Sequence, residues 1–563
     1  MKNPAGKYPP ARTVQLNDRR WPGRTIDKAP IWCSVDLRDG NQALIDPMDA
    51  DRKNRMFDLL VKLGFKEIEI GFPAASQTDF DFCRGLVDAG RIPPDVTVQV
   101  LTQAREPLIQ RTFEALRGVH RAIIHLYNST STLQRKIVFK MDREGVKQLA
   151  VDGARMLRDA AAAHPGSDWI FEYSPESFTG TELDYAQEVC EAVLAVWKPT
   201  PEHRAIINLP ATVENSTPNV YADQIEWMGR KFKNRDSVIL SVHPHNDRGT
   251  AVAATELAML AGADRVEGTL FGNGERTGNA DLVTLALNLY TQGIDPKLNF
   301  SELPGVIECA EYCNQLPVHQ RHPYAGELVF TAFSGSHQDA IKKGFALQKD
   351  KTLWEVPYLP LDPADIGRTY EEIIRVNSQS GKGGVAFILE RDYKVCLPRK
   401  LQVEFSSVIQ KISDETGREI RPKELWDAFE AEYLNQRSPF SCIQYSEKLS
   451  AGKVSISATV KEGSLKHSIA GKGNGPIDAF VGAMNEKFDL ALRIVNYQEQ
   501  SMDEGASSTA MAFVEIQFGK SESVFGVGMN SNVVKASLDA ILSAINRALR
   551  QGKVALPLHG NPA

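Results

Sequence analysis

The sequence lacks a long hydrophobic run, a basic composition and a paired-cysteine pattern. No stretch approaches the roughly 20 apolar residues of a membrane-spanning helix, and residues 1–7 carry no apolar signal-peptide core. A net charge of −6 and a pI near 6.1 argue against a nucleic-acid-binding protein. The seven cysteines include no CxxC pair, and their odd number favours reduced thiols. These absences predict a cytoplasmic protein without membrane or nucleic-acid partners.

A regular alternation of strand and helix patterns occupies the first half of the chain. With 563 residues, 42% of them hydrophobic, the chain can form several domains. Short β-branched runs alternate with longer helical patterns that end at Gly64, Gly118 and Gly262. This rhythm predicts a (β/α)₈ TIM barrel. A doubly wound open sheet is the alternative, but it usually has fewer strands and a Gly-rich first turn. The predicted strands are 31–36, 67–72, 96–101, 121–127, 169–174, 205–210, 238–245 and 265–271.

Candidate metal ligands follow three of the predicted strands. His243 and His245 are two residues apart at the end of the seventh strand, so their side chains point to the same side. Asp39 follows the first strand and Asn279 follows the eighth. These strands are neighbours in a closed barrel, whose active site lies at the carboxyl ends of the strands. Two imidazoles, a carboxylate and an amide oxygen suit Mg²⁺, Mn²⁺ or Zn²⁺. The alternative is a polar loop that holds two of the 11 histidines by chance.

Other polar residues are predicted at the same end of the barrel. Arg38 precedes Asp39, and its fixed charge suits the stabilisation of an oxyanion. A structural salt bridge is the alternative role for Arg38. Glu176 follows the fifth strand, where it can orient Arg38, carry protons or cap the next helix. His125 in the fourth strand and Thr212 after the sixth complete the ring, although such residues are often satisfied core side chains.

Two further regions follow the barrel. The linker contains His337 in Ser334-Gly-Ser-His337, just ahead of a predicted helix. Near the carboxyl end a strand run, a Gly/Asn turn and a helix occur twice, which predicts an α+β domain of two similar halves. Binding or assembly is the expected role of this domain. The predicted regions are an arm at 1–30, the catalytic barrel at 31–300, mainly helical linker subdomains at 301–430 and a regulatory domain at 431–563.

Several motifs together resemble the metal-dependent Claisen-condensing barrel superfamily. Within it, Trp21-Pro-Gly-Arg24, the linker segment with His337 and the duplicated domain resemble the long form of the 2-isopropylmalate synthase family. The barrel motifs are shared with homocitrate and citramalate synthases, so these activities remain alternatives. The barrel motifs are Asp36-Leu-Arg-Asp-Gly-Asn-Gln42, Ser174-Pro-Glu-Ser177, Asn208-Leu-Pro-Ala-Thr212, His243-Pro-His-Asn-Asp247 and Gly272-Asn-Gly-Glu-Arg-Thr-Gly-Asn279.

The resemblance implies an acyltransferase with a defined set of ligands. The implied reaction condenses acetyl-CoA with 3-methyl-2-oxobutanoate and water, as the first committed step of leucine biosynthesis. The implied assembly is a homodimer, and the duplicated domain would bind leucine as a feedback inhibitor. A divalent metal, foremost Mg²⁺ with Mn²⁺ and Zn²⁺ as alternatives, would be held by Asp39, His243, His245 and Asn279.

The resemblance also implies roles for the remaining polar residues. Arg38 would polarise the keto oxygen, while His125, Glu176 and Thr212 would contact the oxo acid. A linker histidine and tyrosine reach the active site of the partner subunit in that family. These residues match His337, as a candidate base, and Tyr370.

Two other classes of protein are alternatives to the condensing enzyme. A barrel metal hydrolase commonly carries its HxH pair on the first strand, where this chain has 36–39, Asp-Leu-Arg-Asp. An amino-acid sensor with an inactive barrel would not need a complete set of ligands beside Arg38. A thiol-release assay with acetyl-CoA separates the three classes.

Overall fold

The computed structural model divides the chain into two compact units. One unit comprises residues 1–329 with 361–369, and the other comprises 330–360 with 370–563. All seven cysteines are free thiols. No helix among the described residues is long and apolar enough to cross a membrane. The structure describes residues 3–8, 13–331, 335–348, 353–368, 382–416, 420–434, 436–450, 452–502, 508–519 and 521–554.

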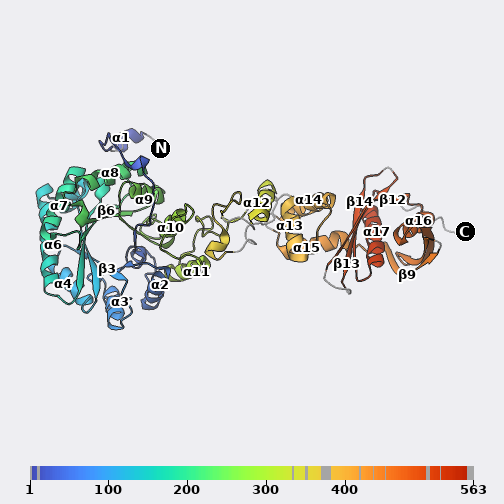
Figure 1. The fold of residues 1–563 in the computed structure, drawn as a ribbon, viewed down its shortest axis with the longest axis horizontal. Coiled ribbons are helices and arrows are strands. Elements are labelled where there is room, and N and C mark those ends of the chain that lie inside the picture. The colour runs from blue at the N-terminus through green and yellow to red at the C-terminus, as the bar shows by residue number, and fades with distance from the viewer. Residues whose placement is uncertain are drawn as a thin grey trace. The chain divides into compact units, whose positions relative to one another are not determined.

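Eight parallel strands of the first unit close into a barrel, with helices such as α4, α6 and α7 around it (Figure 1). Strand β1 pairs with both β2 and β8. The predicted (β/α)₈ barrel is confirmed, and every predicted strand start lies within one residue of the observed start. The strands are almost wholly buried because helices cover the outside of a parallel sheet. Their bounds are β1(Ile31–Ser34), β2(Glu67–Gly71), β3(Thr97–Gln103), β4(Arg121–Ser129), β5(Asp168–Glu176), β6(Ala205–Ala211), β7(Val238–Pro244) and β8(Arg265–Gly268).

The covering helices begin and end at residues with capping roles. In α2, the Asp49 side chain accepts a hydrogen bond from the Arg52 backbone N–H, and Gly64 ends the helix at a φ of 102°. The residues that predict helix ends in the sequence therefore do end this helix in the structure. The helices are α2(Ala50–Leu63), α3(Gln77–Asp88), α4(Glu106–Ala115), α6(Arg143–Ala162), α7(Leu183–Trp197), α8(Pro218–Lys231), α9(Ala251–Leu260), α10(Leu282–Tyr290) and α11(Leu303–Asn314).

The region after the barrel is mainly helical, as predicted. Helix α12(Gly335–Gln348) starts two residues before His337, which therefore lies in the first turn rather than ahead of the helix. Helices α13(Lys382–Tyr393), α14(Arg399–Thr416) and α15(Pro422–Phe429) enclose an apolar cluster. This cluster also includes Met511 and Phe513, so the helices cover one face of a sheet in the C-terminal domain.

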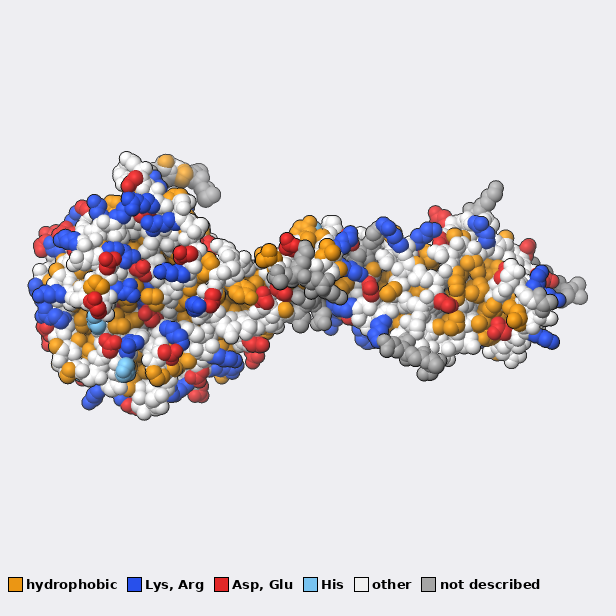
Figure 2. Space-filling view, viewed as in Figure 1, with side chains coloured by type: hydrophobic (Ala, Val, Ile, Leu, Met, Phe, Trp, Pro, Cys, Tyr) orange, Lys and Arg blue, Asp and Glu red, His pale blue; other side chains and the backbone are white. Residues whose placement is uncertain are grey.

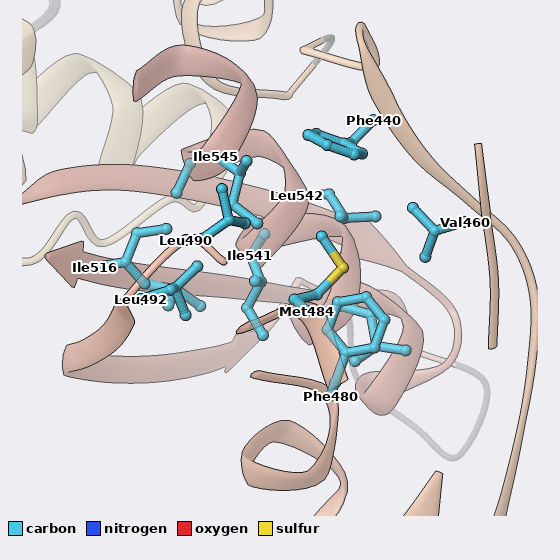
Figure 3. Packing of buried hydrophobic residues seen from close by; sticks show 14 of the residues in the cluster. Phe440, Val460, Phe480, Met484, Leu490, Leu492, Ile516, Ile541, Leu542 and Ile545 are labelled. Atoms are coloured by element: carbon cyan, nitrogen blue, oxygen red, sulfur yellow. The ribbon is translucent and has the colours of Figure 1, made fainter. Parts of the chain in front are cut away.

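The C-terminal domain contains two three-stranded antiparallel sheets, each followed by one helix, which confirms the two strand-rich repeats. Side chains from both halves meet in one apolar core, where Phe480 and Met484 lie near Ile541 (Figure 3). The first repeat contains β9(Phe440–Ser450), β10(Lys453–Glu462), β11(Leu465–Gly473) and α16(Pro476–Phe488). The second contains β12(Leu492–Ser501), β13(Ala510–Phe518), β14(Val524–Asn530) and α17(Val533–Arg550).

Two glycines lie inside strands: Gly471, which the sequence placed in a turn, and Gly526, which the sequence placed in a strand run. Gly471 is in β11, where an added Cβ would lie 2.2 Å from the Ala479 carbonyl oxygen of α16. Gly526 is in β14, where an added Cβ would lie 2.1 Å from the Ala540 carbonyl oxygen of α17. In both repeats glycine lets the helix approach the third strand closely. The expected turn at 471–475 is therefore shorter than predicted.

The face of the barrel unit drawn in Figure 2 carries intermingled acidic and basic side chains. Neither sign of charge dominates that face. This distribution agrees with the small net charge of −6.

Candidate metal centre and active site

Three candidate ligands from two distant segments of the sequence meet at the carboxyl end of the barrel. Asp39 lies in η2(Asp36–Gly40), directly after β1, and His243 is near the end of β7. The Asp39 Oδ2 atom lies 3.6 Å from His243 Nε2 and 3.7 Å from His245 Nε2. All three side chains are buried. Such a buried cluster of one carboxylate and two imidazoles is a candidate site for a divalent cation.

Unpartnered polar atoms at this cluster fit a cation. Asp39 Oδ2 and Asn279 Oδ1 are buried and accept no hydrogen bond from the described residues. Asn279 forms a β-bridge with His245, and its Nδ2 donates to the Asn273 carbonyl oxygen, 3.1 Å away, which leaves Oδ1 as a free acceptor. The loop bends sharply at Gly278, where φ is 98° and an added Cβ would lie 1.9 Å from the Gly272 carbonyl oxygen. Buried acceptors without donors are costly unless a cation or water satisfies them.

Charge in this cluster is unevenly shared. Burial opposes ionisation of Asp39, but Arg38 and His243 hold its pKa well below the usual range. Burial also disfavours protonated His243, but the hydrogen bond to Glu267 and the negative charges of Glu267 and Asp39 raise its pKa to about 9. Burial and the neighbouring His243 lower the pKa of His245 to about 4. The site is therefore built around a permanent carboxylate, to which cations are attracted.

Arg38 is fixed between two carboxylates. Its Nε donates to Glu69 Oε2 at 2.5 Å, and its Nη1 donates to Asp39 Oδ1 at 2.6 Å. Glu69 lies on β2 and is fully buried. The sequence reasoning missed Glu69, although an acidic residue between two isoleucines in a predicted strand was a usable signal. Arg38 is thus oriented by Glu69 and Asp39, and not by the expected Glu176.

The other predicted residues lie on neighbouring strands at the same end. The carboxyl group of Glu176 is half-buried, and burial raises its pKa. The expected role of Glu176 as a helix cap is not seen, because Glu182 precedes α7. Thr212 follows β6, and its Oγ1 accepts a hydrogen bond from the Ser177 N–H at 2.9 Å. Both residues therefore remain available as rim groups, with Thr212 already tied to the loop after β5.

His125 lies deeper, inside the barrel. Its Nε2 is 2.7 Å from Ser174 Oγ, and its Nδ1 is 3.1 Å from Glu69 Oε1. His125 also forms a three-residue cluster with Glu172 and Glu267. The guanidinium of Arg265 lies in the same place and donates to Glu267 Oε1 at 2.8 Å. This second cluster therefore already contains a cation, which distinguishes it from the Asp39 site.

A cavity of about 900 Å³ opens between the loops that follow β4, β5 and β6. Ser177 and Arg248 line it, so it borders the loops that carry Glu176 and His245. Leu133 and Val138, on the loop after β4, also line the cavity and are 65% and 63% exposed. The combination of apolar side chains and hydroxyl groups is typical of a site for an organic ligand.

The predicted linker residue His337 belongs to the second unit. His337 is exposed on α12, and its ring stacks on Tyr358 with centroids 4.0 Å apart and planes 30° apart. Tyr358 has a φ of 65°, and the Trp354 indole N–H, four residues earlier, donates to the Leu359 carbonyl oxygen at 2.7 Å. Sequence reasoning did not single out Tyr358. The predicted Tyr370 lies outside the described residues.

The barrel, linker and C-terminal domain each match a known protein family. Residues 29–309 match the HMGL-like family, residues 327–390 match the alpha-isopropylmalate synthase post-catalytic domain-like family, and residues 419–549 match the LeuA allosteric (dimerisation) domain. The barrel and its candidate metal centre thus define an enzyme of the HMGL-like class.

Relatives that extend over nearly the whole chain identify the family more closely. The chain is 60% identical to the 2-isopropylmalate synthase of Rhodospirillum rubrum over 552 residues, which are 97% of this chain and 99% of that protein. It is 58% identical to the 2-isopropylmalate synthase of Paraburkholderia xenovorans over 549 residues, with 97% and 95% coverage. The chain belongs to the 2-isopropylmalate synthase family.

Proposed function

We propose that the protein condenses acetyl-CoA with 3-methyl-2-oxobutanoate and water to give 2-isopropylmalate and CoA, the first committed step of leucine biosynthesis. The observation that carries this proposal is the meeting of Asp39, His243 and His245 beside an Arg38 that is held by Glu69. The names of relatives at 58–60% identity support the choice of substrates. The alternative is the same chemistry on another 2-oxo acid, as in citramalate or homocitrate synthases.

The candidate cation is a divalent metal held by Asp39, His243, His245 and Asn279, with Mg²⁺ first and Mn²⁺ or Zn²⁺ as alternatives. When bound, such an ion supplies positive charge that polarises the keto group of the oxo acid. In the proposed reaction Arg38 stabilises the negative charge that develops on the keto oxygen, because its position is fixed before substrate arrives.

Other polar residues of the barrel are proposed to bind the oxo acid and to handle protons. His125 and Thr212 are proposed to contact the oxo acid. Burial raises the pKa of Glu176, which makes this carboxyl group a candidate to carry a proton in the reaction. These roles place the two groups at the ends of different strands: Glu176 is the last residue of β5, and Arg38 lies in η2, after β1.

The decisive experiment offers acetyl-CoA with a panel of 2-oxo acids and follows the release of free CoA. We expect 3-methyl-2-oxobutanoate to have the highest kcat/KM, and the product to be 2-isopropylmalate by mass spectrometry. A higher kcat/KM with pyruvate or 2-oxoglutarate would reassign the substrate but keep the reaction class. Absence of CoA release with every oxo acid would refute the condensation itself.

We propose that His337 acts as a base toward the acetyl methyl group or the hydrolytic water, in the active site of the partner subunit of a cytoplasmic homodimer. Its support is an exposed imidazole whose orientation is limited by stacking on Tyr358. The test compares His337→Ala with the parent under saturating substrates. A general base is worth about 10²- to 10⁴-fold, so kcat should fall at least about 100-fold. An unchanged kcat with a raised KM would make His337 a binding residue. The matching role for Tyr370 stays a prediction.

We further propose that residues 431–563 form a domain that binds leucine as a feedback inhibitor. The match of residues 419–549 to the LeuA allosteric (dimerisation) domain supports this proposal. The domain contains a cavity of about 590 Å³, lined by apolar side chains such as Ile477 and Ile494, and by Arg493. An aliphatic surface with one guanidinium suits an aliphatic amino acid with a carboxylate.

The turns at the two helix starts are less open to a carboxylate than the sequence suggests. Asn532 accepts from the Lys535 N–H at 3.0 Å and from the Tyr445 hydroxyl at 2.9 Å. Asp478 accepts from the Asn474 N–H at 2.9 Å, next to Gly475. Protein side chains therefore already occupy N–H groups at both turns.

Leucine inhibition is tested by measuring CoA release against leucine concentration. Arg493→Gln should weaken inhibition at unchanged activity without leucine, whereas Lys487→Gln, on α16 outside the cavity lining, serves as the control. Coupling of about 1 to 3 kcal/mol between sites is typical. Inhibition that competes with the oxo acid and persists in Arg493→Gln would place leucine in the barrel. If leucine neither binds nor inhibits the parent, the proposal of a leucine-responsive domain fails.

A further inference from the structure

Glu267 on β8 is a fully buried carboxylate that contacts one of the candidate metal ligands from behind. Its Oε2 accepts from His243 Nδ1 at 2.7 Å and from Asn208 Nδ2 at 3.1 Å. Its Oε1 accepts from Arg265 Nη1 at 2.8 Å and from Gln99 Nε2 at 3.0 Å. Four donors on two oxygens fill the accepting capacity of a carboxylate. The carboxylate therefore has a single orientation.

This arrangement decides which nitrogen of His243 carries the proton. A carboxylate accepts hydrogen bonds but donates none, so His243 Nδ1 must hold a hydrogen to bond with Glu267. In the neutral imidazole, Nε2 is then the nitrogen with the free lone pair. Nε2 is also the atom that faces Asp39 Oδ2, 3.6 Å away. The tautomer set by Glu267 is the one that can bind a cation at the Asp39 site.

Arg265 fixes Glu267 in turn. Its side chain has no exposed surface, and its Nη1 also donates to Ser241 Oγ at 2.9 Å. Its Nη2 donates to Gln99 Oε1 at 2.6 Å, and its Nε donates to Glu67 Oε2 at 2.5 Å. These contacts join β8 to β7, β3 and β2 across the barrel interior. A guanidinium with donors committed on three sides cannot rotate without breaking several bonds.

We propose that Glu267 is a positioning residue, which fixes the proton of His243 on Nδ1 and thereby keeps the candidate metal centre ready to bind a divalent cation, with Arg265 as its anchor. Outer carboxylates that accept from a ligating histidine commonly do this, and their loss costs about 10- to 100-fold in metal affinity. The inference rests on the metal site of the proposed function, but it assigns a new task to residues outside that site.

The test is the affinity of the chelator-treated, full-length protein for Mn²⁺, measured by calorimetry and by the electron paramagnetic resonance of free Mn²⁺. The variant is Glu267→Gln, which keeps the size of the side chain. The amide NH₂ of this glutamine faces either His243 Nδ1 or Arg265 Nη1. Each of these nitrogens already donates a hydrogen bond, so a donor then faces a donor. We expect about 10- to 100-fold weaker Mn²⁺ binding. Glu267→Asp retains a carboxylate and should recover part of the affinity.

Glu172→Gln is the matched control. Glu172 lies on β5 in the same cluster and is fully buried. Its carboxyl oxygens lie 3.5 Å from His125 Nε2 and from Arg265 Nη1, but neither has a hydrogen bond from the described residues. Burial raises the pKa of Glu172 well above its usual range, which favours the neutral form, and glutamine has the size and neutrality of that form. Its Mn²⁺ affinity should match that of the parent within a few-fold.

The outcomes separate this inference from the proposed function. If the parent releases CoA normally and a folded Glu267→Gln protein binds Mn²⁺ as tightly as the parent, the inference is overturned and the proposed function stands. Equal weakening in Glu267→Gln and Glu172→Gln also overturns it, because the effect would then come from general disturbance of the interior. A parent that binds no Mn²⁺, and whose CoA release needs no divalent cation, refutes the metal site as well. If Glu267→Gln does not fold, Glu267→Asp is compared with Glu267→Ala. Tighter Mn²⁺ binding by Glu267→Asp than by Glu267→Ala supports the need for a carboxylate. Equal Mn²⁺ affinity of these two variants overturns the inference.

Discussion

The interior of the barrel and the apolar core of the C-terminal domain differ in the side chains that they bury. The barrel interior holds fully buried charged side chains, among them Arg265, Glu69 and Glu267. The C-terminal domain has a large apolar core with side chains such as Phe480, Met484 and Ile541 (Figure 3), and its buried charged side chains include Arg547 and Glu515. Burying charge usually costs stability even when the charges are paired. The barrel therefore holds its chemical groups in place at a cost in stability. In the C-terminal domain, close packing holds the two halves together.

The largest expected effect follows from removing the cation at the centre of the barrel network. Arg265→Met would leave Glu67 and Glu267 without their buried partner, and breaking a buried ion pair costs about 3 to 5 kcal/mol. We expect a much lower unfolding temperature for the barrel, measured by calorimetry. Lys297→Met removes an exposed ion pair with Asp295 and serves as the control, without a change in stability. Equal stability of both variants would show that the network is not needed for the fold.

A change at the metal centre should abolish activity and leave the fold intact. Asp39→Ala removes the permanent carboxylate between His243 and His245, so we expect more than about 100-fold slower CoA release and loss of Mn²⁺ binding. The exposed Asp51→Ala in α2 is the control. Normal turnover and Mn²⁺ binding in a folded Asp39→Ala protein would exclude this site.

The C-terminal domain should respond in the opposite way. In Gly526→Ala the new Cβ would lie 2.1 Å from the Ala540 carbonyl oxygen, so α17 must shift. Overpacking of this kind costs about 1 to 3 kcal/mol, whereas turnover without leucine should persist. Gly482→Ala in α16 meets nothing within 4 Å and should slightly stabilise the helix. Thermal unfolding of both variants checks the prediction, and parent-like unfolding of Gly526→Ala would contradict the close packing of strand and helix.

The last expected effect is a pH dependence of stability in the barrel. Burial raises the pKa of Asp36 to about 7, against about 3.9 in an unfolded chain. The folded state therefore keeps this proton where the unfolded state releases it, and stability falls as the pH rises from about 4 to 7. Asp36→Asn cannot ionise, so its stability relative to the parent should rise by up to about 1.4 kcal/mol per pH unit in that range. Unfolding temperatures of both proteins at pH 5, 6 and 8 test this, and a constant difference would contradict it.

Local sequence patterns predicted the barrel but only part of the C-terminal domain. The barrel strands are short apolar runs between helices with clear stop signals, such as Gly64, so their starts were readable. Strands β9, β11 and β12 were not singled out because many of their side chains are exposed and polar. Gly471 read as part of a turn because the helix that requires a glycine there, α16, contacts it only in the folded domain.

The order of parallel strands in the sequence was enough to expect Asp39, His243 and Asn279 at one end of a barrel, because neighbouring strand ends meet there. Only the tertiary structure decided which groups stand behind them. Glu69, Glu267 and Arg265 stand in predicted strands, but their function depends on partners on other strands, which the sequence does not name. Strand periodicity tells which face a side chain occupies, but not which distant side chain it meets across a closed barrel.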